Sequence, residues 1–207
     1  MQSLTPELVL QAYAHGYFPM ADPDEDDALF WWLPERRTLL PVCDFHVPRR
    51  LARTIRSGRF RVSLNEAFEA VLDACRDRAE GTWISEEIAA VFLKLHGLGR
   101  AYSVEVWKGD VLAGGLYGLA LGRAFFAESM FFRERDASKV ALAELARLLC
   151  RREYMILDAQ FMTEHLRQFG AYEVDDEVYQ KMLQEALSID QKADPLLAIL
   201  LGTDRFD

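Results

Sequence analysis

The stretch from residue 101 to residue 132 constrains the fold of this chain more than any other. It contains three β-prone runs, YSVEVW, VLAGGLYGLAL and AFFAESMF, which are separated only by short stretches around KGD and GR. Apolar and β-branched runs joined by such turn-forming residues are typical of consecutive antiparallel strands. The stretch therefore predicts a three-strand meander with an unusually glycine-rich central strand.

Helices are expected on both sides of this meander. Apolar residues at helical spacing predict helices over 4–17, 48–58, 64–75, 86–97, 137–149, a short one from 163, and 176–187. The expected N-capping residues are Thr5, Ser63, Ser85, Asp136 and Thr163. Further strands are expected at RFRVSL, YMILDAQ and AYEV, and irregular structure from Phe18 to Pro48. This order predicts an α+β domain with a mixed sheet flanked by helices on both faces.

Composition excludes several classes of protein. With 51% apolar residues the chain can bury a substantial core, and its longest stretches of low polarity, 111–121 and 195–202, are too short to span a bilayer. No signal-peptide pattern begins at Met1, so we expect a cytoplasmic protein. Scattered Cys43, Cys75 and Cys150 predict buried free thiols, and the four histidines show no metal-ligand spacing.

Charge is distributed unevenly along the chain. The net charge of −9 argues against nonspecific coating of nucleic acid, and 171–194 carries seven acids against two lysines. By contrast, residues 46–61 contain six arginines and no acid. Helical spacing places Arg49, Arg53 and Arg56 on one side of the expected helix, where they form a basic stripe. One face is therefore expected to attract a polyanion, although a solvated helix face is the alternative.

A carboxylate within an apolar run points to a candidate site. Glu128 lies in FFAESMFF, and side chains two apart on a strand share a face, so Phe126, Glu128 and Met130 are expected to point the same way. Asp158 and Gln160 are expected to share a face of another strand. If these strands are neighbours, the three polar groups converge in an apolar sheet, either as a site or as a stabilising buried network.

The order of elements resembles the GNAT acetyltransferase fold. In that family a glycine-containing loop at the start of the helix after the meander binds the pyrophosphate of acetyl-CoA. The corresponding segment here, FFRERDASK, contains no glycine, so its backbone cannot easily form an amide cradle. Acetyl-CoA is therefore a poor candidate, and we expect neither a cofactor nor a metal.

Nine stretches give a more specific resemblance. In order along residues 8–172 they are AYAHGYFPM, FWWLPERR, EGTWI, YSVEVW, GGLYG, ESMFF, ASKVAL, LDAQ and HLRQFGA. They resemble the bacterial leucyl/phenylalanyl-tRNA–protein transferases, whose larger domain is GNAT-like. The resemblance implies transfer of leucine or phenylalanine, or methionine, from its tRNA to the N-terminal Arg or Lys of a protein, which marks that protein for degradation. The expected partners are thus aminoacyl-tRNA and an acceptor protein, and a monomer is expected.

The same resemblance implies roles for individual residues. Gln160 would accept a hydrogen bond from the attacking amine, Asp158 would polarise it, and Glu128 would bind the donor's α-ammonium or ribose hydroxyls. The aminoacyl pocket maps onto Leu116, Ser129, Met130, Leu145, Leu149 and Leu157. Contacts with the 3′ adenosine or the peptide map onto Tyr13, Met20, Trp83 and Thr163. The acceptor stem would contact Arg49, Arg50, Arg53 and Arg56, which we call the arginine stripe.

Several features depart from the family pattern. Met20 and Thr163 stand where tryptophan and asparagine are common, and the family's Gly-Gly-Asp-Leu and Ile-Pro-Arg stretches are missing. The expected divisions are a small N-terminal domain (1–60), a GNAT-like catalytic domain (61–187) and an extension (188–207) without a match. Trp83, taken alone, fits core packing as well as a stacking platform. A GNAT-like acyltransferase with another donor and a noncatalytic tRNA- or N-terminus-binding module are the alternative functions.

Overall fold

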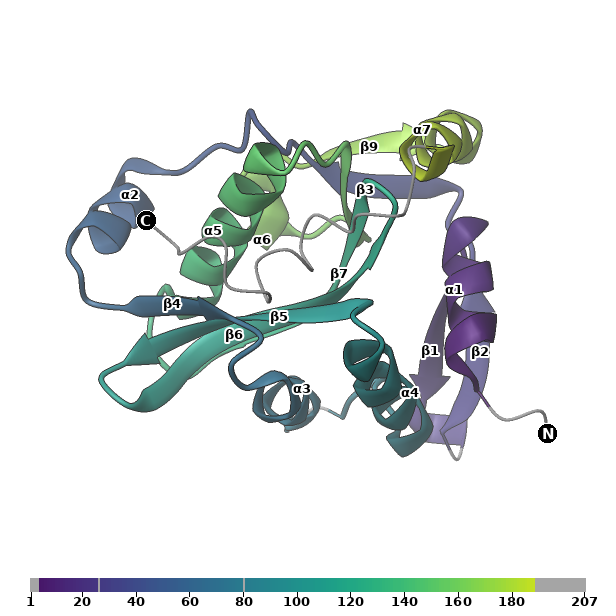
Figure 1. The fold of residues 1–207 in the computed structure, drawn as a ribbon, viewed down its shortest axis with the longest axis horizontal. Coiled ribbons are helices and arrows are strands. Elements are labelled where there is room, and N and C mark those ends of the chain that lie inside the picture. The colour runs from purple at the N-terminus through teal and green to yellow at the C-terminus, as the bar shows by residue number, and fades with distance from the viewer. Residues whose placement is uncertain (1–3, 26, 80, 189–207) are drawn as a thin grey trace.

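The structure, a computed structural model, describes residues 4–188 except 26 and 80. The predicted C-terminal extension therefore lies almost wholly outside the described residues. Figure 1 shows the elements in chain order. They are α1 (Pro6–Ala14), β1 (Phe18–Asp22), a 3-10 turn η1 (Pro23–Glu25), β2 (Ala28–Trp32), β3 (Arg36–Leu40), α2 (Arg49–Arg56), β4 (Arg61–Leu64), α3 (Phe68–Arg76), α4 (Glu86–Gly97), β5 (Ala101–Lys108), β6 (Val111–Leu121), β7 (Ala124–Phe132), α5 (Ala137–Arg151), β8 (Ile156–Gln160), α6 (Glu164–Arg167), β9 (Tyr172–Asp175) and α7 (Asp176–Ser188).

A seven-stranded mixed sheet organises the molecule. Its strand order is β4-β5-β6-β7-β8-β3-β9; the β7–β8 pair is parallel and the other neighbours are antiparallel. The predicted meander forms β5, β6 and β7, and the predicted pairing of its third strand with the LDAQ strand is confirmed. The α+β class is therefore confirmed.

Helices cover both faces of this sheet and divide the core in two. Figure 1 shows α5 with α2 and α6 on one face, and α3 and α4 on the other. One apolar cluster joins α1, α3, α4 and α7 to the sheet, and the second joins α5, α2 and α6 to it. Burial of both sheet faces explains why β6 is apolar along nearly its whole length instead of alternating.

Local capping signals proved reliable at three of the five positions. The hydroxyls of Thr5, Ser85 and Thr163 each accept a hydrogen bond from the backbone three residues on. Ser63 was predicted wrongly: it lies inside β4 and donates to the buried Glu105 carboxylate at 2.6 Å. Asp136 does precede α5, but in a left-handed conformation and without a side-chain capping bond.

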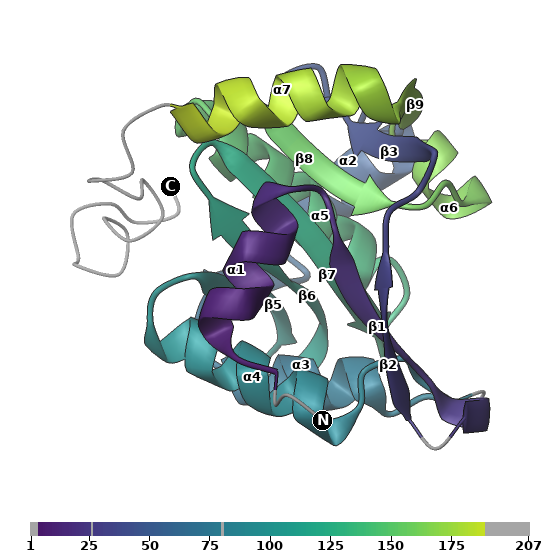
Figure 2. The ribbon, with the colours of Figure 1, turned by 90° about the vertical axis from the view of Figure 1, so that its right-hand side faces the viewer.

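The segment from Phe18 to Pro48 is not irregular as predicted, since it contains β1, β2 and β3. Strands β1 and β2 form an antiparallel ribbon of their own, which Figures 1 and 2 show running from β3 toward α4. Strand β3 enters the large sheet between β8 and β9. Its partners come from the other end of the chain, so local composition carried no signal of this pairing.

The cysteine prediction is wrong for two of the three residues. Cys43, between β3 and α2, forms a disulfide with Cys150 of α5, with a Cα–Cα distance of 4.9 Å across a sequence separation of 107. The packing of α2 against α5 brings the two positions together, which their spacing along the sequence could not reveal. Cys75 is a buried free thiol, as predicted.

Two β-bulges lie side by side on β7 and β8. Ala127 pairs with Gly118 but Ser129 pairs with Tyr117, so Glu128 is an extra residue without a cross-strand partner. On β8, Asp158 pairs with Leu39 but Gln160 pairs with Thr38, which leaves Ala159 as the extra residue. A bulge reverses the alternation of side chains between the faces beyond it.

The bulges correct the predicted side-chain directions. Phe126 packs in the cluster on the α1 face, whereas Met130 packs against the cluster on the α5 face, so these two do not point the same way. Asp158 and Gln160 likewise have different surroundings, because Gln160 follows the second bulge and adopts a left-handed conformation with φ 57°.

Candidate functional site

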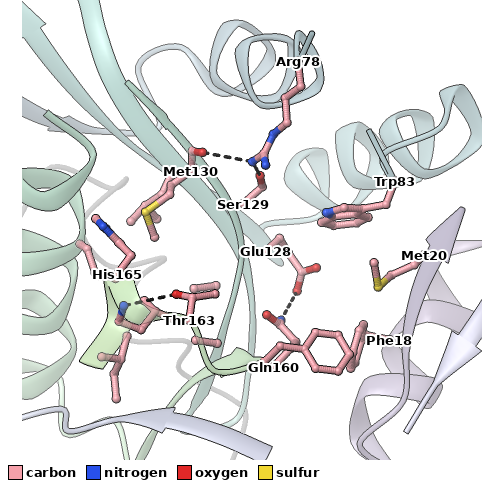
Figure 3. A pocket seen from close by; sticks show the side chains of 17 residues that line it. Phe18, Met20, Arg78, Trp83, Glu128, Ser129, Met130, Gln160, Thr163 and His165 are labelled. Carbon is pink, nitrogen blue, oxygen red and sulfur yellow. Dashed lines mark hydrogen bonds between the residues drawn. The ribbon is translucent and has the colours of Figure 1, made fainter. Parts of the chain in front are cut away.

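A pocket opens where β7 and β8 part. The parallel pairing ends at Phe126 and Asp158, and beyond that point residues 127–130 of β7 and 159–161 at the end of β8 line opposite sides of a cavity of about 290 Å³. Figure 3 shows this cavity between the sheet and the β1 strand. We call it the β7–β8 pocket; its lining residues are Phe18, Met20, Leu40, Arg78, Trp83, Leu116, Ala127, Glu128, Ser129, Met130, Leu142, Ala159, Gln160, Phe161, Thr163, His165 and Leu166.

Glu128 and Gln160 face each other across the pocket (Figure 3). The Gln160 amide Nε2 donates to Glu128 Oε1 at 3.3 Å. Because the amide nitrogen is engaged in this way, Gln160 Oε1 is left to accept a hydrogen bond from a group that enters the pocket. The predicted convergence of these two side chains is thus present in the structure.

Asp158 lies beneath the pocket and does not line it. Its carboxylate is fully buried and accepts hydrogen bonds from three groups. Arg37 Nε donates to both carboxylate oxygens, at 3.0 and 2.8 Å, the Tyr179 hydroxyl donates at 2.6 Å, and the backbone N–H of Gln160 donates at 2.8 Å. The last bond helps to hold Gln160 in its left-handed conformation, which is unfavourable for a residue other than glycine. Asp158 therefore reaches the Gln160 backbone, not its side chain.

Arg37 completes this buried network. Its guanidinium also donates to the Gly16 carbonyl at 2.9 Å and lies over the rings of Phe18 and Tyr179, 4.8 and 4.7 Å from their centroids. A buried carboxylate paired and hydrogen-bonded in this way avoids the cost of an isolated buried charge. The network ties the turn after α1 to β3, β8 and α7 next to Gln160.

The surroundings of Glu128 favour its neutral form. Burial is the main cause that raises the pKa of this carboxyl to about 8. The neighbouring Tyr13 hydroxyl acts to lower the pKa, the charge of Asp158 acts to raise it, and the charge of Arg37 acts to lower it. The side chain is only half-buried because its exposed part faces the pocket. An acid held near neutrality with an open side toward a cavity can bind a cationic group and release its proton.

The residues predicted for the aminoacyl pocket are divided between cavity and core. Leu116, Ser129 and Met130 line the cavity. Leu145, Leu149 and Leu157 are fully buried in the cluster on the α5 face and do not line it. Leu142 and Leu166, from the same cluster on the α5 face, line the cavity instead.

The residues predicted for adenosine or peptide contacts are likewise divided. Trp83 and Met20 line the rim of the pocket, and Thr163 lines it while capping α6. Tyr13 is wholly buried, packs edge-on against Phe126 with ring centroids 4.9 Å apart, and does not line the cavity. Burial raises the pKa of its hydroxyl, and Glu128 beside it contributes in the same direction.

The arginine stripe lies apart from the pocket. All four of its side chains are exposed on α2, which Figure 1 shows on the far side of α5 from β1 and β2. Within the described residues none of the four forms an ion pair with an acid, in contrast to Arg59 and Arg61, which pair with Glu134 and Glu66. The stripe is thus a separate basic surface on the α5 side of the molecule.

Several residues of the site were not predicted from the sequence. Arg37 and Tyr179 are needed to explain Asp158, yet no local pattern distinguishes a buried arginine in RRTLL from an exposed one. Phe18 and Phe161 stack edge-on at the pocket with centroids 5.6 Å apart. Arg78, shortly before Trp83 in the sequence, also lines the pocket.

Within the described part of the chain, no group of three or more His, Cys, Asp and Glu side chains is placed to hold a metal ion. None of the helices formed by those same residues combines the length and apolar content needed to cross a bilayer.

Two family models match the chain over consecutive segments. The model described as leucyl/phenylalanyl-tRNA protein transferase matches residues 39–184, and the model of that family's N-terminal domain matches residues 2–35. Curated relatives carry the same name. One from Rhodopseudomonas palustris (strain HaA2) is 52% identical over 187 residues, covering 89% of this chain and 84% of the relative. Another, from Paramagnetospirillum magneticum, is 52% identical over 192 residues and covers 91% of each.

Among solved structures the likeness is weaker. A conserved protein of unknown function from Bacteroides thetaiotaomicron is 12% identical, with a TM-score of 0.44 over 72% of this chain and 55% of that one.

Proposed function

Because the chain belongs to the leucyl/phenylalanyl-tRNA protein transferase family, we propose that the β7–β8 pocket transfers an aminoacyl group from tRNA to the N-terminal amine of a protein. The family makes the chain an aminoacyltransferase. The finer proposal is that leucine or phenylalanine is the donor residue, and that the acceptor begins with Arg or Lys.

The reaction is aminolysis of an ester. A neutral acceptor amine attacks the ester carbonyl carbon, and the resulting tetrahedral intermediate expels the ribose oxygen, which takes up a proton lost by the amine. A peptide bond forms and the tRNA hydroxyl is released. An activated ester needs mainly alignment of the amine and stabilisation of the charge that develops on the carbonyl oxygen.

The Glu128–Gln160 pair is the observation that carries this proposal. Glu128 engages the amide nitrogen, so Gln160 Oε1 is available to accept from the attacking amine. An amide oxygen is too weak a base to remove a proton fully, so its contribution is to hold the amine on the carbonyl. Asp158 supports the pair by fixing the Gln160 backbone.

The lining of the pocket suits an apolar donor side chain. Leu40, Leu116, Met130, Leu142 and Leu166 line the cavity and belong to, or pack against, the cluster on the α5 face, whereas Trp83 packs against the cluster on the other face. Such a lining discriminates by size and shape, at about 1–3 kcal/mol for each methylene. Glu128, at the boundary, is placed to receive the α-ammonium of the donor residue or its ribose hydroxyls.

The test uses charged tRNAs and a panel of peptides. The protein is incubated with Leu-, Phe-, Met- and Val-charged tRNA and with peptides beginning with Arg, Lys or Ala, and mass spectrometry detects any addition. We expect a leucyl or phenylalanyl addition to the Arg and Lys peptides. Absence of any addition, with intact tRNA and folded protein, would contradict the proposal and favour a noncatalytic binding module.

A variant tests the role of Gln160 in the same assay. Gln160→Ala removes the acceptor atom but leaves the pocket open, so kcat should fall by about 100-fold or more while the affinity for aminoacyl-tRNA changes little. Leu142→Met, a volume-conserving change in the apolar lining, serves as the matched variant and should retain most of the kcat. An equal loss of kcat and tRNA affinity in Gln160→Ala would show that Gln160 does not act in the chemical step.

A further inference from the structure

Arg78 is a fixed cation at the rim of a pocket that otherwise carries a carboxyl group. It lies just after α3, and its Nε donates to the Cys75 carbonyl at 3.1 Å. Its Nη2 donates to Ser129 Oγ at 2.7 Å and to the Met130 carbonyl at 3.3 Å. Figure 3 shows the guanidinium reaching down to these two residues of β7.

One nitrogen of this guanidinium, Nη1, takes no part in these three bonds. Among the residues that the structure describes, Nη1 has no hydrogen-bond partner, and Arg78 is exposed. Of the described side chains that line the pocket, it is the only permanent cation. A guanidinium held by three bonds loses little further freedom on binding an anion, so it is preorganised for one.

The position of Arg78 indicates which anion it meets. It is anchored to Ser129, the chain neighbour of Glu128, and it lines the same pocket as Trp83. In a nucleoside esterified on its ribose and stacked at Trp83, the 5′ carbon belongs to the sugar that carries the ester, so it would lie one sugar away from the reacting carbonyl and near a cation that lines the same pocket. In a tRNA that 5′ carbon carries a phosphate.

We propose that Arg78 binds the phosphate on the 5′ side of the donor's terminal nucleoside, and so fixes the distance of the ester from Gln160. This assignment rests on the proposed function, since it takes aminoacyl-tRNA as the donor. Arg78 is a positioning residue: it contacts the nucleotide and not the reacting atoms.

Two small donors that differ only in this phosphate test the assignment. They are the 2′(3′)-phenylalanyl ester of adenosine and the same ester of adenosine 5′-phosphate, offered with an Arg-initiated peptide. The Arg78→Gln variant should lose about 10- to 100-fold in kcat/KM with the phosphorylated donor, the range for a charge-assisted hydrogen bond. With adenosine as the donor nucleoside, kcat/KM should stay within about two-fold of the parent value.

Controls separate this proposal from a structural role. Arg61→Ala removes an exposed arginine of β4 that pairs with Glu66, and it should leave both donors unaffected. An equal loss of activity with both donors in Arg78→Gln would show that Arg78 only supports Ser129 and Met130, and would overturn the assignment. No loss with either donor would overturn it as well.

A binding measurement covers the case in which the small donors are turned over too slowly. Adenosine 5′-phosphate should compete with aminoacyl-tRNA more strongly than adenosine does in the parent protein, and equally in Arg78→Gln. If the parent protein transfers nothing from any donor but retains this difference, the proposed function fails while the phosphate site stands. An identical potency of the two competitors in the parent protein would refute the site.

Discussion

At the scale of single residues, Glu128 shows what burial does to a functional carboxyl. Its convergence with Gln160 was predictable, because strand spacing and the order of elements already placed both near one spot in the sheet. The partners of Asp158 were not predictable, since Arg37 and Tyr179 come from β3 and α7 and meet it only through tertiary packing. Sequence spacing thus indicates which polar groups gather, but not which of them faces the cavity.

The raised pKa of Glu128 predicts a pH-dependent stability. The pKa of this carboxyl rises from 4.5 to about 8 in the folded protein, so between these values the folded state binds more protons than the unfolded state. Its contribution to stability is therefore complete below pH 4.5 and is lost as the pH rises through 8. The free energy of unfolding of Glu128→Gln should fall less steeply than that of the parent protein over this range.

Urea unfolding at intervals across that pH range measures the difference. The exposed Glu69 on α3 provides the control, since Glu69→Gln removes a carboxyl that is not buried and should follow the parent curve. Parallel curves for the parent protein and Glu128→Gln would mean that Glu128 is already ionised in the folded state at neutral pH.

At the scale of elements, the two bulges create the site. In a regular β7, Glu128 would have a cross-strand partner on β6. In a regular β8, Gln160 would point to the same face of the sheet as Asp158. The meander, its neighbour β8 and most helices were predictable from apolar periodicity. The bulges were not, because the sequence around them continues the strand pattern without interruption, apart from the glycines of β6.

Gly118 is expected to be essential for the β7 bulge. A Cβ added there would lie 2.2 Å from the Phe126 carbonyl oxygen and 2.5 Å from the Phe125 ring, so β7 would have to move. Gly118→Ala should lower the free energy of unfolding by about 1–3 kcal/mol or more, as overpacking does, and should reduce kcat among the molecules that remain folded. Denaturant unfolding and activity assays check the two effects.

Gly97 provides the matched substitution. It lies at the end of α4 with open space where a Cβ would be added, so Gly97→Ala should be neutral or stabilising by about 0.5–1 kcal/mol. Equal stability of Gly118→Ala and the parent protein would show that the bulge tolerates a side chain opposite it.

At the scale of the whole molecule, positive charge is concentrated on one surface. The chain has a net charge of −9, yet the arginine stripe on α2 concentrates four exposed cations on one helix. Composition and helical spacing predicted this basic stripe without a structure. The position of α2 beyond α5, away from the pocket, required the fold.

We expect the arginine stripe to contribute to tRNA affinity through phosphate contacts. Replacing Arg49, Arg50, Arg53 and Arg56 by Gln should weaken tRNA binding and reduce the magnitude of the slope of log K against log salt concentration by up to about 3.6. Turnover of a small adenosine ester, which cannot reach α2, should be unchanged. An unaltered salt dependence of tRNA binding would exclude the stripe from the interface.

The placement of β3 also determines when the site can form during synthesis. Arg37 emerges from the ribosome 121 residues before its partner Asp158, an interval of roughly 6–24 seconds at about 5–20 residues per second. Until then β3 has neither of its neighbours, β8 and β9, and both its edges are unpaired. A nascent chain therefore has no Arg37–Asp158 pair to hold Gln160, and this part of the site can be completed only after β8 has emerged.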